Sequence, residues 1–343
     1  MMVEQVKVWL QEVLGPQFSV AAAWVYWSLI KPIFAEPRLH WLLFLFAAAV
    51  ALIFYLSRPT NARSARGFFS YLFPKSIYSH RSAILDCKFY VVHQLLMAHV
   101  RFGALVIALA GLLHVGDGVT QAMSALFGKG PGWAEPSAVA LAGFTLAVLM
   151  ASDLGKFIAH YALHKVPVLW EFHKVHHAAE VLMPITSFRT HPVENMLDFF
   201  LRLTCTALVA GVYAWFYPTG IAEATILTFN AVAFLIFLPI THLQHSHVAL
   251  GYGQKMSRVL VSPLMHQVHH SCESRHWDKN LGFIFPFWDW IAGTLYVPKS
   301  DEQFRLGLPG GTEQLDSVWR LYVQPIVAAG RLLVRRRPAQ TRA

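Results

Sequence analysis

The sequence predicts an all-α fold, a polytopic bundle of about six transmembrane helices or fewer, with a histidine-rich helical cap on its cytoplasmic side. Hydrophobic residues make up 55% of the 343 residues and charged residues only 14%, which is too apolar for an ordinary soluble domain. Apolar runs of bilayer-spanning length recur along the chain. Thirteen of the 18 histidines fall between His160 and His276. These observations predict a membrane protein with a clustered polar site.

The first 17 residues have no signal-peptide pattern, but Val3, Val6, Leu10 and Val13 recur at helical spacing and predict an interfacial helix. Lys and Arg concentrate in short cytoplasmic loops. The 58–90 connection carries six of them, whereas the 116–136 connection carries one. Both termini and all the histidine clusters are therefore predicted on the cytoplasmic side. The candidate spans are 18–34, 41–57, 91–115, 137–158, 197–217 and 221–242.

Three regions follow from this arrangement. Residues 1–136 are predicted to be an N-terminal membrane region with the interfacial helix and about three spans. Residues 137–298 contain the histidine clusters, and 299–343 form a cytoplasmic tail with a basic end. We expect the arginines at that end to contact anionic lipid, or less plausibly an acidic partner protein.

Three histidine boxes predict a metal centre. Residues three or four apart share a helix face, and clustered neutral imidazoles are metal ligands. Eight such side chains exceed what one ion can bind, so more than one ion is predicted. Three scattered cysteines offer no thiolate site. The boxes are His160 and His164; His173, His176 and His177; and His266, His269 and His270, with His242, His245 and His247 between the second and third.

The all-nitrogen character of these boxes favours redox-active iron and O₂ chemistry on lipid C–H bonds. Dinuclear hydrolases usually recruit bridging carboxylates, and no H-E-x-x-H arrangement is present. A zinc-dependent lipid hydrolase stays open as an alternative, because imidazole also suits zinc. A non-catalytic lipid-binding protein is the other alternative, although such a protein would be expected to have lost box histidines.

The motifs resemble those of the fatty acid hydroxylase and sterol desaturase superfamily, the integral-membrane non-haem di-iron oxidoreductases. The resemblance covers about residues 145–298 and depends on the order of five blocks. These blocks are HYALH, WEFHKVHH, SFRTHPVE, SPLMHQVHHS and DKNLGFIFPFWDWIAGTLY.

The resemblance implies that the eight box histidines bind two Fe ions, with zinc as a substitute in purified protein and O₂ as co-substrate. It implies one or two further ligands among His242, His245 and His247, of which we favour His245. His191, in a Thr-His-Pro turn, is a candidate second-shell donor or a turn residue, and Asn280 is a candidate second-shell or loop residue. No haem or bound nucleotide is expected, because Leu308-Pro309-Gly310-Gly311 lacks the haem-ligating histidine and no G-x-G-x-x-G follows a strand pattern.

The family resemblance implies a monooxygenase that hydroxylates a sterol-like or fatty acyl lipid, with desaturation as the alternative outcome of the same hydrogen abstraction. Both reactions need electrons, and the sequence shows no reductase motif or cysteine set for an iron–sulfur cluster. A separate ferredoxin or cytochrome b5-type donor is therefore expected. Beyond the lipid, the donor and the membrane, no nucleic-acid partner is predicted.

Overall fold

The computed structural model describes residues 41–57, 64–218, 241–299 and 301–335, in which every regular element is a helix. The all-α prediction is confirmed for these residues, whose β pairing is an isolated bridge between Ser271 and Leu306. The helices are α4 (Trp41–Ser57), α5 (Ala65–Leu72), α6 (Lys75–Tyr78), α7 (Arg81–Phe127), α8 (Ala138–Lys165), α9 (Pro167–His177), η3 (Pro184–Phe188), α10 (Pro192–Phe216), α12 (Thr241–Gln244), α13 (Gly253–Met256), α14 (Pro263–His269), η4 (Ser274–His276), α15 (Phe287–Ala292), η5 (Glu313–Leu315) and α16 (Val318–Arg335).

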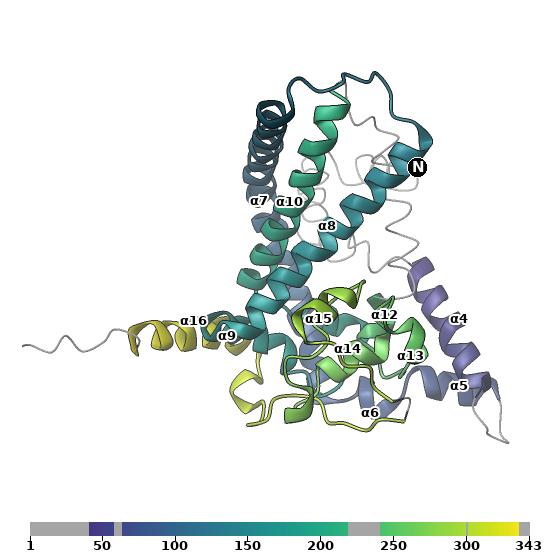
Figure 1. The fold of residues 1–343 in the computed structure, drawn as a ribbon. Coiled ribbons are helices and arrows are strands. Elements are labelled where there is room, and N and C mark those ends of the chain that lie inside the picture. The colour runs from purple at the N-terminus through teal and green to yellow at the C-terminus, as the bar shows by residue number, and fades with distance from the viewer. Residues whose placement is uncertain (1–40, 58–63, 219–240, 300, 336–343) are drawn as a thin grey trace, which may run out of the picture.

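Three long helices, α7, α8 and α10, stand together, and the shorter helices gather at one end of them (Figure 1). Glycines allow two close helix crossings. A Cβ at Gly155 of α8 would lie 2.6 Å from Cα of Arg202 in α10, and one at Gly211 of α10 would lie 2.5 Å from the Gly116 carbonyl oxygen of α7. Small residues permit backbones to approach in this way in membrane helix pairs. The close crossings fix α8, whose end carries the first histidine pair.

In the described part of the chain, α8 and α10 are long and apolar enough to cross a membrane, and α4 is a shorter apolar helix. They correspond to the predicted spans 137–158, 197–217 and 41–57. Helix α8 continues beyond the predicted end of its span, and this extension carries His160 and His164. The histidine site is therefore attached to a continuous helix and not to a loop.

The described part of the structure does not show the remaining predicted spans as separate helices. The run 91–115 lies inside α7, a single 47-residue helix that begins at Arg81, well before the expected span. The interfacial helix at 1–17, the span 18–34 and nearly all of 221–242 lie outside the described residues. The six-span topology thus stays a prediction.

The cap is organised around a buried ion pair between Arg189, which follows η3, and Asp86 of α7. Nη1 of Arg189 donates to Oδ1 of Asp86 at 2.9 Å, and its Nε donates to the Val175 carbonyl of α9 at 3.0 Å. Breaking a buried pair by removing one partner costs about 3–5 kcal/mol, because the other charge is left uncompensated. These contacts hold α9, which carries the second histidine box, against the base of α7.

The tail packs on the cap and is not a separate appendage. Helix α16 lies against α9 and across the foot of the long helices (Figure 1). Leu315 and Leu321 are buried with Phe89 of α7 and Val175 of α9, and the Tyr322 ring stacks on Phe89 with centroids 4.9 Å apart. The predicted region boundaries at 136 and 299 therefore do not coincide with breaks in packing, and they stay predictions.

Candidate metal centre

The three histidine boxes lie on helices that converge at the junction of α8 with the cap. The end of α8 carries His160 and His164, and α9 carries the second box. Helix α14 carries His266 and His269, and His270 caps its end. Proline at the first position starts both short helices, where its missing N–H costs no hydrogen bond. The Ser262 hydroxyl caps α14 by accepting from the Met265 amide at 3.3 Å. Local sequence thus fixes where the helices that carry the second and third boxes begin.

The structure divides the histidines into two groups whose potential ligand atoms lie within 4.8 Å of one another. The five-histidine group consists of His160, His164, His173, His177 and His269. The four-histidine group consists of His176, His245, His266 and His270.

The division follows helical geometry. Residues four apart in each box share one group: His173 with His177 in α9, and His266 with His270 at α14. The third member of each box, His176 or His269, belongs to the other group. The two H-x-x-H-H boxes are therefore interleaved, and the His177 and His270 rings stack between the groups with centroids 4.7 Å apart.

The Nε2 atoms face one another inside each group. Nε2 of His173 lies 3.0 Å from that of His160 and 3.1 Å from that of His177. In the other group, Nε2 of His245 lies 3.1 Å from that of His176 and 3.0 Å from that of His266. Two nitrogens about 2.1 Å from a shared ion and at right angles to each other would be about 3.0 Å apart. The spacing fits ligands of one ion.

The hydrogen bonds at Nδ1 show why these close approaches need a cation. Nδ1 of His160 donates to the Leu281 carbonyl at 2.8 Å, and Nδ1 of His269 donates to the Lys279 carbonyl at 2.9 Å. A neutral imidazole with its proton on Nδ1 carries a lone pair on Nε2. The lone pairs inside the group repel one another unless a cation lies between them. A metal ion satisfies this arrangement, and the backbone carbonyls hold the rings in the orientation that metal-binding histidines require.

Two carboxylates complete the outer contacts of the five-histidine group. Oε1 of Glu194, in the first turn of α10, lies 3.0 Å from Nδ1 of His173. Oδ1 of Asp278 lies 3.3 Å from Nδ1 of His164. The hydrogen bond with His164, followed by that with Lys165, lowers the pKa of Asp278 to about 2, so this carboxylate is ionised at neutral pH. Carboxylates placed in this way raise the basicity of a ligand imidazole.

Burial keeps the cap histidines neutral. It is the main reason that the pKa of His173, His177 and His269 lies well below the ordinary value, and neighbouring imidazoles lower it further. Burial lowers the pKa of His176 to about 3. His266 and His270 have strongly lowered pKa values for the same reason. Because metal ligands must be unprotonated, both groups are ready to bind ions at neutral pH.

The segment 278–282 supplies outer contacts to three of the five ligands. Asp278 and Asn280 both have φ of +56°, a left-handed conformation that is costly for residues other than glycine. Side-chain hydrogen bonds support the segment: Nδ2 of Asn280 donates to the Met265 carbonyl at 3.1 Å, and Oδ1 of Asp289 accepts from the Leu281 amide at 2.7 Å. The strained turn points successive polar groups at three different rings.

Asn280 thus acts through the backbone and contacts no ligand ring in the described structure, where its Oδ1 accepts from the Tyr296 amide at 2.8 Å. His191 has a different role from a second-shell donor: its Nδ1 caps α10 by accepting from the Val193 amide, and its Nε2 donates to the Tyr322 carbonyl at 3.1 Å. The turn-stabilising alternative for His191 therefore matches its observed contacts.

The three histidines between the boxes fall in different places. His245 lies in the four-histidine group. His247 lies outside both groups, and its Nε2 donates to the Tyr71 carbonyl at 2.7 Å. The side chain of His242 lies outside the described residues. Of the two histidines that follow the end of α12 at Gln244, only His245 is placed with the grouped histidines.

Sequence reasoning missed Glu194 and Asp278 as partners of the ligands. Both residues lie close to the boxes in sequence, and Glu194 follows His191 within the SFRTHPVE block. An acidic residue in the first turn of a helix is also explained by the helix dipole, so the pattern alone did not require a metal-site role. Their positions against His173 and His164 depend on contacts between separate helices.

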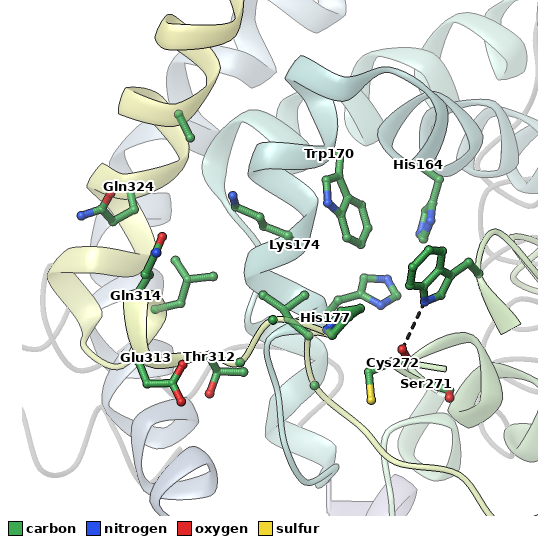
Figure 2. Close-up of a pocket in the computed structure, with 18 of the residues that line it drawn as sticks. His164, Trp170, Lys174, His177, Ser271, Cys272, Thr312, Glu313, Gln314 and Gln324 are labelled. Carbon is green, nitrogen blue, oxygen red and sulfur yellow. Dashed lines mark hydrogen bonds between the residues drawn. The ribbon is translucent and has the colours of Figure 1, made fainter. Parts of the chain in front are cut away.

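A cavity of about 540 Å³ reaches the five-histidine group from the side of the tail (Figure 2). His164, His177 and His269 form part of its lining, with the indoles of Trp170 and Trp277 beside them. No member of the four-histidine group is among the described residues that line it. Loop 307–315 and α16 form the opposite wall. The cavity gives molecules of lipid-fragment size access to one of the two groups.

The stretch of sequence that contains these histidines matches a known protein family. A fatty acid hydroxylase family model matches residues 145–294, the stretch that contains all nine grouped histidines as well as Glu194 and Asp278. This part of the chain is similar to the fatty acid hydroxylase family, which supports the superfamily resemblance. The family assignment made from the box motifs is confirmed.

Curated proteins show similarity over about half of this chain. An ornithine lipid hydroxylase of Rhizobium tropici is 26% identical over 162 residues, which are 47% of this chain and 44% of the relative. An alkylglycerol monooxygenase of Danio rerio is 26% identical, covering 50% of this chain and 34% of the relative. Human lathosterol oxidase is 22% identical, covering 46% of each. The chain thus spans less than half the length of these relatives, and no solved structure matches it.

Proposed function

We propose that this chain is a membrane-bound, O₂-dependent lipid hydroxylase that holds one iron in each histidine group. The observation that carries the proposal is the pair of adjacent buried groups in which the potential ligands are imidazole nitrogens throughout. Imidazole suits iron and zinc alike, whereas the similar proteins are named as hydroxylase, monooxygenase and oxidase. Those names favour a redox-active metal over the hydrolytic zinc alternative.

Iron in such a site supplies the activation of O₂ that attack on an unactivated C–H bond requires. The chain supplies the positions. The carbonyls of Leu281 and Lys279 hold the rings of His160 and His269, while Glu194 and Asp278 orient His173 and His164. The cavity borders the five-histidine group, so we propose that the reacting carbon of the lipid approaches that group.

Trp170 forms part of the cavity wall along the route by which we propose that the lipid approaches the five-histidine group. Its ring packs beside those of His164 and His177 with centroids 5.2 and 5.3 Å away, and it forms an apolar wall next to two ligands. An apolar wall favours a hydrocarbon substrate and excludes water from the reacting bond.

We further propose the six-span topology, with the cap and both termini on the cytoplasmic side and a separate ferredoxin or cytochrome b5-type donor supplying electrons. The support is the distribution of Lys and Arg along the sequence and the position of the histidine groups at the end of α8, the helix that is apolar enough to span the bilayer. On this topology the cavity that borders the five-histidine group opens on the cytoplasmic side of the membrane, where a soluble reductant also reaches the protein.

The test is comparative lipid mass spectrometry with ¹⁸O₂ on cells that express the native chain or the His176→Ala/His269→Ala variant, which removes one ligand from each group. The matched control is His114→Ala, an exposed histidine of α7 outside both groups. We expect a lipid that gains one ¹⁸O atom with the native chain and the control but not with the double variant.

Other outcomes assign the alternatives. A lipid that loses two hydrogens and gains no oxygen makes the protein a desaturase acting through the same site. Release of a fatty acid without O₂ makes it a zinc-type hydrolase, and an equal product from the double variant removes catalysis from the histidine groups altogether.

A further inference from the structure

Helix α16 has an exposed apolar face that is not used in the packing of the described chain. Trp319 is 73% exposed, Ile326 57% and Val334 73%. These positions are seven and eight residues apart, which places them on one side of a helix. Val327 and Leu333 are exposed on the same side. Monomeric soluble proteins rarely leave such a contiguous apolar surface in water.

Buried contacts on the other sides of α16 fix the orientation of this face. Leu321 and Ala329 are buried, and the Tyr322 ring stacks on Phe89 of α7. The His191 ring donates to the Tyr322 carbonyl and attaches the helix to the start of α10. The helix is therefore held in one rotational position, and the exposure of Trp319 and Ile326 follows from that position.

Figure 1 shows α16 lying across the long helices, at the end where α8 leaves the bundle and α9 begins. Gln324 and Ala328 line the cavity together with loop 307–315, which lies on the side away from the long helices (Figures 1 and 2). Ile326 is two residues from each of them, or about 200° around the helix. The apolar face is therefore turned toward the side on which α8 and α10 rise.

Charge identifies the partner. Residues 318–343 contain six arginines and no Asp or Glu. Arg331 is exposed, Arg335 ends the helix, and Arg336 and Arg337 follow in sequence. An amphipathic helix with an apolar face containing Trp and with basic residues beside it binds the interface of an anionic bilayer. Arginines near such a surface strengthen the attraction to anionic lipid.

We propose that α16 lies in the interfacial layer of the membrane, with Trp319, Ile326 and Leu333 among the lipid chains and its arginines against anionic headgroups. The helix would then separate the bilayer surface from the cavity that borders the five-histidine group. The inference uses the membrane orientation proposed above and does not depend on the reaction.

The test places an environment-sensitive fluorescent amino acid at position 326 of the full chain, reconstituted in phosphatidylcholine vesicles with or without phosphatidylglycerol. The matched control carries the same label at Gln303, an exposed polar position of the cap. We expect brominated acyl chains to quench the label at 326 and aqueous iodide to spare it, with the reverse at 303. Metal content equal to that of the native chain shows that each labelled protein is folded.

The charge component is tested by replacing Arg331, Arg335, Arg336 and Arg337 with Gln. We expect phosphatidylglycerol to increase quenching by brominated lipid in the native background and to have no effect in this variant. Iodide access at 326 would overturn the proposal. Protection from both quenchers would also overturn it, because a protein surface, such as a second copy of the chain, would then cover the face. None of these readouts requires catalytic turnover. The position of α16 can therefore be tested even if the proposed hydroxylase reaction is wrong.

Discussion

The five-histidine group and the four-histidine group are built from the same boxes but have different surroundings. Three rings of the larger group are hydrogen-bonded at Nδ1 to Leu281, Lys279 or Asp278, and a Glu194 oxygen lies 3.0 Å from Nδ1 of His173. In the smaller group, Nδ1 of His270 is buried without a hydrogen-bond partner among the described residues. The cavity also borders the larger group. The larger group therefore has more of its rings fixed by outer contacts and borders the cavity, whereas no member of the smaller group is among the described cavity-lining residues.

The largest expected effect comes from removing one ligand from each group. His270→Ala leaves three histidines in the smaller group, and His269→Ala leaves four in the larger. We expect both variants to lose activity, but His270→Ala to lose about one ion per chain and His269→Ala to retain more metal, because four ligands still saturate an ion. Elemental analysis of the purified proteins measures this. Equal loss of both ions in each variant would show that the two groups bind metal as one interdependent site.

Acid should destabilise the metal-free protein. The buried imidazoles have lowered pKa values, to about 3 for His176, while an unfolded chain binds protons on histidine near pH 6.5. Stability is therefore full above about pH 6.5 and falls as the pH decreases toward 3, by up to about 1.4 kcal/mol per pH unit for each proton taken up on unfolding. Thermal unfolding of chelator-treated protein across this range measures the slope.

The His266→Leu variant tests whether buried histidines cause this pH dependence of stability. The His266 ring belongs to the four-histidine group, and burial strongly lowers its pKa. We expect the variant to unfold with a shallower pH dependence than the native chain. A slope that is flat in the native protein, or unchanged in the variant, would show that these rings are not protonated on unfolding.

The outer carboxylates should have an intermediate effect. Glu194→Gln and Asp278→Asn retain the shape of each side chain but replace the carboxyl group beside His173 or His164 by an amide. Loss of such contacts typically costs about 10–100-fold in metal affinity or activity. Competition with a chelator measures the affinity. Glu302→Gln is the matched control, because Glu302 contacts the buried His276, which lies outside both groups; a similar loss in the control would attribute the effect to general destabilisation.

The smallest effect is expected at Asn280. Both Asn280→Gly and Asn280→Ala remove the hydrogen bonds to Met265 and Tyr296, but only glycine relieves the φ of +56°. We expect the alanine variant to be less stable than the glycine variant by about 1 kcal/mol. Chemical denaturation of the two proteins under identical conditions tests the order. Equal stabilities would mean that the turn relaxes when its side-chain contacts are removed.

The boxes were predictable because their information is local. A spacing of four along a helix brings His160 to His164 and His266 to His270 whatever the remainder of the chain does. The preference for His245 over its neighbours came from the family resemblance and not from helical spacing. The contacts of Glu194 and Asp278 were not predictable, because each joins residues that only the crossing of separate helices brings together.

The long helix α7 illustrates the same limit in the fold. Hydropathy marks the run 91–115 but not where a helix continues outside the lipid. Its start is set by the His80 ring, which accepts from the Ser82 amide, and its end by Gly128 with φ of +80°. Cap residues of this kind can be recognised only after the element is known. Likewise, the packing of the tail on α9 depends on Leu315 and Leu321 reaching a core formed by residues far away in sequence.

The interleaving of the boxes has a mechanical consequence. Because α9 carries His173 and His177 for one group and His176 for the other, a twist of this helix displaces side chains of both groups together. The same is true of α14 through His269 and its neighbours. The two helices therefore link the two groups mechanically. Adding one residue inside either box would turn the following histidine by about 100° around the helix axis and move it out of its present group.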